Sequence, residues 1–100
     1  MSHTESQQDD PQQEAFWLRT DEVIALANQQ SEQASSEEVS GSLLYASARF
    51  NAFLIAASAG NKASLEANKE DAIEYFTEQY RQLLTENLDD YLENFDDYTA

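Results

Sequence analysis

The chain has 100 residues, no cysteine, and 20 acidic side chains against five Lys and Arg, which gives a formal net charge of −15. Without cysteine, the chain has no disulfides, no thiolate catalysis and no Cys-ligated zinc or iron–sulfur centre. So acidic a surface repels phosphate backbones and anionic lipid heads, and we therefore expect no direct binding to nucleic acid or to membranes.

The first nine residues, MSHTESQQD, have no large apolar side chain after the initiator and contain the single histidine, His3. We expect residues 1–9 to form a disordered polar tail and residues 10–100 to form one helical domain. The N-terminus has no basic patch followed by an apolar run, and the longest apolar run, residues 52–57, is far shorter than the roughly 20 residues of a membrane span. A soluble cytoplasmic protein is expected.

A first helix is predicted over residues 11–33. Asp10 is a suitable cap, Pro11 suits the first helical position, and Gln13 has the spacing of a capping box. The polar residues 29–33 end the periodic pattern. The apolar face of this helix comprises Phe16, Val23, Ile24 and Ala27, with Trp17 at its edge.

The central stretch, residues 39–60, carries a single charge, on Arg49. Residues 34–36 form a connector in which Ser35 makes a capping box with Glu38, and the helix that follows is predicted to end at Ala59, before Gly60. One face steps by four and three residues along the whole helix, which is an a/d seam: Val39, Leu43, Ala46, Phe50, Phe53 and Ala57. We expect the flanking helices to cover this seam, because its phenylalanines would otherwise lie in water.

Residues 61–68 are interpreted as a link, with Asn68 capping a third helix over residues 69–95. An alternative breaks this helix at Asn87 and makes residues 88–95 a short fourth helix. No segment alternates with period two, so no sheet is expected. The apolar stripe of the third helix is Ile73, Phe76, Tyr80, Leu84, Leu88, Tyr91 and Phe95.

The predicted fold is therefore all-α, a three-helix bundle with a central apolar helix and a long C-terminal helix. The central helix has a second face of small residues nearly opposite the seam, so it needs two neighbours. The first and third helices of one chain can provide both, and a second copy of the chain is the other way to cover this helix. We expect a homodimer, because the third helix is long enough for its end to pack on a second chain.

The predicted helical domain lacks the residue types of nucleophilic catalysis, and although a pair of carboxylates could act as acid and base, no Glu or Asp interrupts an apolar stripe, where a shifted pKa would be expected. The domain has no histidine or cysteine to serve a nucleophilic triad, no Glu-x-x-His pair for a di-metal site, and no glycine-rich phosphate loop. We therefore expect a protein that is not an enzyme and that has no cofactor and no metal.

Arg49 and Tyr45 are candidate interaction residues on the central helix. The Arg49 guanidinium is expected either to pair with an acid on the first or third helix, or to form a cationic spot for an anionic ligand or a partner carboxylate. Trp17 is expected to cover the end of the core, with partner contact as the alternative. Tyr75 lies on the polar side of the third helix, where an exposed aromatic ring is a mild sign of contact.

The acidic C-terminal region contains Asp89, Asp90, Asp96 and Asp97 without any basic residue. The simpler interpretation is a solvated helix face. The alternatives are a weak calcium or magnesium site and a surface that meets something basic, although helical spacing places carboxylates in a line rather than around an ion.

Three segments of the chain carry a resemblance to a known family. They are AFWLRTDEVIALAN (residues 15–28), LLYASARFNAF (residues 43–53) and EYFTEQYRQLLTENLDDYLENF (residues 74–95). Together they resemble a family of short acidic bacterial proteins described only as a domain of unknown function. The resemblance covers about residues 15–95 and implies an all-helical fold and a bacterial cytoplasmic location. It implies no activity, ligand or catalytic residue.

Three functional hypotheses follow. The first is a non-enzymatic interaction protein that binds a protein partner through its helical surfaces. The second is an acidic mimic of nucleic acid that occupies the site of a basic protein, and the third is a small-ligand binder with a pocket near Arg49 and Tyr45.

Overall fold

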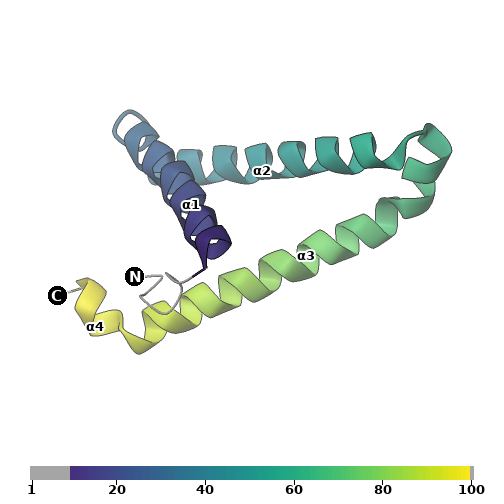
Figure 1. Cartoon of the computed structure of the whole chain (residues 1–100). Helices are drawn as coiled ribbons and strands as arrows, with labels where there is room; N and C mark the ends of the chain where they lie inside the picture. Colours follow the sequence, from purple (N-terminus) through teal and green to yellow (C-terminus); the bar gives the residue numbers. More distant parts are fainter. Residues whose placement is uncertain (1–9, 100) are drawn as a thin grey trace. The chain divides into compact units, whose positions relative to one another are not determined.

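The computed structural model describes residues 10–99, and within that range the chain forms four helices and no strand. The predicted all-α class is confirmed. The disordered tail predicted for residues 1–9, which includes His3, lies outside the described residues. In chain order (Figure 1), the helices are α1 (Pro11–Gln30), α2 (Ser36–Ala59), α3 (Lys62–Glu93) and α4 (Phe95–Thr99).

The chain divides into two compact units, Met1–Phe50 and Asn51–Ala100. The boundary falls inside α2, so the first unit holds α1 and the first part of α2. The second unit holds the end of α2 together with α3 and α4. That residues 10–100 form a single domain stays a prediction.

Helix α1 starts as predicted and ends three residues earlier than predicted. The Asp10 side chain accepts a hydrogen bond from the backbone N–H of Gln12 at 3.0 Å, and Pro11 occupies the first helical position, where a missing N–H is harmless. At the other end, the Ser31 hydroxyl donates to the Ala27 carbonyl at 3.0 Å. Residues 31–34 then form a turn, because three polar side chains and one alanine offer no large apolar side chain to prolong the packed face of the helix.

Helix α2 has the ends that the sequence predicted. The Glu38 N–H donates to the Ser35 hydroxyl at 3.1 Å, and the Ser35 N–H donates to the Glu38 carboxylate at 3.1 Å. This reciprocal capping box satisfies two donors that the helix itself leaves unpaired. The helix stops at Ala59. Gly60 follows with φ of +83°, a left-handed conformation that is strained for any L-residue with a Cβ atom.

The two glycines give a matched stability test. Gly60→Ala is expected to lower the free energy of unfolding by about 1–2 kcal/mol, because alanine is strained at positive φ. Gly41→Ala is expected to raise it by about 0.5–1 kcal/mol, because Gly41 lies inside α2 and alanine has less freedom to lose on folding. A Cβ at either position meets no atom within 4 Å, so crowding does not confound the comparison. Urea unfolding followed by circular dichroism at 222 nm measures both, and equal shifts for the two variants would contradict the backbone explanation.

Helix α3 starts seven residues before the predicted position, so the link predicted for residues 61–68 is wrong. Asn61, not Asn68, is the cap: its side chain accepts from the Ser64 N–H at 2.9 Å. The sequence carries this signal, because Asn61 follows the helix-ending Gly60 directly and precedes helix-forming residues such as Ala63 and Leu65.

The break near the C-terminus occurs at Asn94, and not at Asn87. The Asn87 amide donates to the Leu83 carbonyl at 2.8 Å, one turn back, and α3 continues through it. At Asn94 the backbone leaves helical geometry, with φ of −110° and ψ of 28°. Both the predicted end of the third helix at Phe95 and the alternative helix over residues 88–95 are therefore wrong, and Phe95 opens α4.

Flanking helices were expected to cover the central helix, but within the first unit α1 does not cover Phe50, and within the second unit α3 does not cover Phe53. Val39, with 6% of its surface exposed, is the only buried side chain among those the structure describes. Phe50 and Phe53 are 64% and 68% exposed. The physical reason is that caps and periodicity act within one helix, whereas covering an apolar face needs a second surface of matching shape.

Candidate functional site

An exposed apolar face runs along α2, and we call it the α2 seam. Its side chains lie on one side of a single helix and are exposed after the first of them, Val39. Monomeric soluble proteins rarely leave a contiguous apolar patch in water unless it contacts something. The seam consists of Val39, Leu43, Ala46, Phe50, Phe53 and Ala57.

A second apolar row runs along α3, and we call it the α3 stripe. Its members are three or four residues apart and are exposed, like those of the α2 seam. Phe95, predicted to extend this row, belongs instead to α4. The α3 stripe consists of Ile73, Phe76, Tyr80, Leu84, Leu88 and Tyr91.

Arg49 contacts Tyr45 one turn earlier on α2. Its Nη2 donates to the Tyr45 hydroxyl at 3.3 Å, and its guanidinium carbon lies 5.0 Å from the centre of the Tyr45 ring. Among residues 10–50, no carboxylate forms an ion pair with Arg49, so the expected pairing with an acid of the first helix is not found. An exposed cation–π contact of this kind contributes about 0.5–1 kcal/mol. Arg49 therefore keeps most of its five N–H donors for solvent or for another molecule.

The two other aromatic candidates differ in exposure. Trp17 is partly covered, and its ring meets the Phe16 ring edge-on at a centroid distance of 5.0 Å. Tyr75 is 59% exposed and meets Phe76 edge-on at 5.2 Å. Both contacts join neighbours in sequence and orient the rings relative to each other. The predicted exposure of Tyr75 is confirmed.

The C-terminal carboxylates do not share one helix as the sequence suggested. Asp89 and Asp90 belong to α3, whereas Asp96 and Asp97 follow the break and start α4. The Asp90 carboxylate accepts a hydrogen bond from the Asn94 amide at 3.2 Å. Between residues 10 and 99, no three His, Asp or Glu side chains come together in a way that could hold a metal ion.

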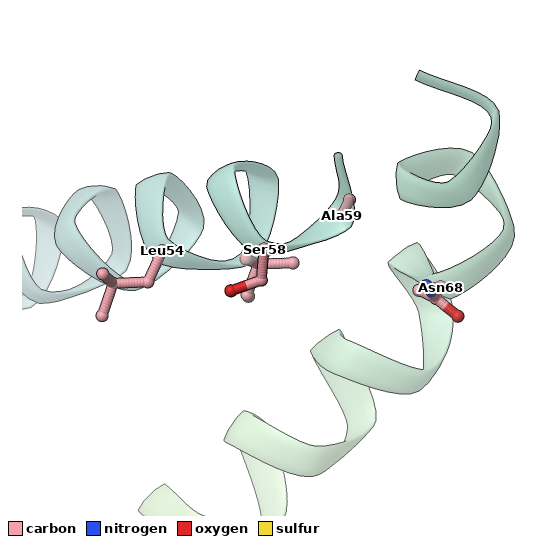
Figure 2. A pocket seen from close by; sticks show the side chains of 5 residues that line it. Leu54, Ser58, Ala59 and Asn68 are labelled. Carbon is pink, nitrogen blue, oxygen red and sulfur yellow. The ribbon is translucent and has the colours of Figure 1, made fainter. Parts of the chain in front are cut away.

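A shallow hollow, missed by the sequence analysis, lies where the end of α2 meets the first turns of α3 (Figure 2). It is lined by Leu54, Ile55, Ser58, Ala59 and Asn68. The sequence gives no sign of this hollow, because it predicts Asn68 in a link, whereas Asn68 lies on α3. Its lining has no titratable group, so it offers packing space for an apolar side chain and no chemistry. Its lining includes neither Tyr45 nor Arg49, so it gives no support to a pocket beside Arg49.

The described geometry thus defines a small all-α protein whose helices present apolar faces to solvent. No helix between residues 10 and 99 combines the length and the apolar character that crossing a bilayer requires. The chain belongs to the DUF3144 family, proteins of unknown function, whose family model matches residues 16–92. The comparison with curated proteins found no match, and neither did the comparison with solved structures.

Proposed function

We propose that this chain is a non-enzymatic protein–protein interaction module that works through its exposed helix faces. The observation that supports this most is the exposure of Phe50 and Phe53 on a helix with one charged residue after its first turn. Buried aromatic side chains contribute much of the binding free energy of protein interfaces. Removing such rings from water is favourable, so two exposed phenylalanines favour contact with another surface.

A photo-crosslinking residue at position 53, introduced into the full chain in its native host, tests this function. We expect it to give discrete cross-linked protein products. The same residue at position 40, on the polar side of α2, is the matched control and should give few. Cross-linking from position 53 no stronger than from position 40 would contradict the proposal.

If the chain is instead an acidic mimic of nucleic acid, partner binding should depend on the C-terminal carboxylates and on salt concentration. There, a basic partner is held by Asp89, Asp90, Asp96 and Asp97, and replacing all four with Asn should abolish its capture, as should high salt. Under our proposal the products from position 53 persist in that variant. If the cross-linked products disappeared in the four-Asn variant but were retained in Phe50→Ala, the result would support the acidic mimic instead.

A further inference from the structure

The charge distribution separates α2 from the other long helices. Beyond its first turn α2 carries no carboxylate and one cation, Arg49, although the chain as a whole has a net charge of −15. Helix α3 has nine acidic and three basic side chains over Lys62–Glu93. A second copy of so acidic a chain is repelled at most of its surface, and the α2 seam is where two copies can meet without opposing carboxylates.

Helix α2 also has a second face without charged or large polar side chains. Nearly opposite the α2 seam lies a row of small side chains that allows close approach of another helix: Gly41, Ala48, Ala52, Ala56 and Ala59. A helix that is apolar or small on two sides needs two neighbours. A partner bound by its basic charge would be attracted to the carboxylates of α3 and α4, and it would leave the seam in water.

The area of the seam suits a pair of copies. A phenylalanine side chain buries roughly 150–250 Å² when covered, and Phe50 and Phe53 are about two-thirds exposed. Two rings from each of two copies therefore supply about 400–700 Å², by the same estimate. A stable specific interface buries about 1,200–2,000 Å² in total. The rings alone fall short of this area, so Leu43, the alanines of the seam and the side chains that flank it along the 24-residue helix, which is about 36 Å long, must supply the rest.

From these observations we infer that the α2 seam is covered by the α2 seam of a second copy of this chain. The inference rests on the proposed interaction function and names its partner. Ala46 lies near the middle of the seam, so a charge there faces the other copy, whereas Ser40 lies on the polar side of the same helix.

Sedimentation equilibrium of the full chain tests this inference. The unmodified protein is expected at about 22.6 kDa, twice the chain mass of 11.3 kDa. Ala46→Glu should weaken self-association by about thirtyfold or more and give 11.3 kDa at the same concentration, since a central interface position is disrupted. Ser40→Glu adds the same charge away from the seam and should leave the dimer intact.

Mixing two charge variants controls for the possibility that Ala46→Glu prevents folding rather than association. Ala46→Lys should fail to dimerise like Ala46→Glu, and an equimolar mixture of the two variants should recover both the helical signal and the dimer mass, because opposite charges then meet. A dimer that tolerates Ala46→Glu, or a mixture that recovers nothing, would overturn the inference. So would an unmodified chain that is monomeric and fully helical. Cross-links from position 53 to a different protein would then leave the interaction function standing without the self-association.

Discussion

Phe53→Ala is expected to lower the free energy of unfolding by about 3–5 kcal/mol, the usual loss for a buried phenylalanine. The reason is that the ring, which is exposed in the single chain, would be covered in the dimer that we propose. If the ring stayed in water, the same substitution would change stability by no more than about 0.5 kcal/mol. Because alanine favours helix, local propensity acts against the expected loss and cannot cause it. Urea unfolding at one fixed protein concentration distinguishes the two magnitudes.

Tyr75→Ala is the matched control for this measurement. Tyr75 is an exposed aromatic residue on the polar side of α3, and it lies outside the α3 stripe. Its removal is expected to change the free energy of unfolding by about 0.5 kcal/mol or less. A loss at Tyr75 as large as that at Phe53 would show that exposed aromatic rings in this chain contribute for some other reason.

A hundredfold dilution is expected to lower the melting temperature of the helices by about 5–10 °C. Dilution by this factor shifts an association equilibrium by about 2.7 kcal/mol. A unit of two chains, 200 residues in all, changes its melting temperature by about 2–4 °C per kcal/mol. Thermal unfolding followed by circular dichroism at both concentrations gives the shift. A chain that covered its own apolar faces would melt at one temperature regardless of dilution.

The parts of the fold that depend on local signals could be predicted from the sequence. The Ser35–Glu38 capping box and the positive φ at Gly60 set both ends of α2 where they were expected. Asp10 and Pro11 likewise set the start of α1. Each of these features acts over a few neighbouring residues, so the amino-acid types at the right spacing are sufficient evidence.

The errors arose where two local signals competed. Asn61 and Asn68 can both cap a helix, and the one directly after Gly60 does so. Asn87 and Asn94 both donate their side-chain amides to the carbonyl one turn back, at Leu83 and Asp90, yet α3 continues through Asn87 and ends at Asn94. The side-chain hydrogen bond is therefore common to both and does not explain which of the two ends the helix.

What covers the apolar faces could not be predicted from the sequence. Periodicity showed which side of α2 is apolar, and that spacing is confirmed on the helix. It did not show that Phe50 and Phe53 would be two-thirds exposed, because periodicity has no information about a second surface. The same limit applies to Arg49, where the sequence indicated a need for a partner and the structure supplies the Tyr45 ring.

The most direct test measures the contact of the Phe50 and Phe53 rings with water in the unmodified protein. A soluble paramagnetic probe broadens the NMR signals of ring protons that it can approach, and the Tyr75 ring serves as the exposed reference. At concentrations where the protein is associated, we predict several-fold weaker broadening at both phenylalanines than at Tyr75. Equal broadening at all three rings, in a protein that retains its full helical signal, would contradict the account.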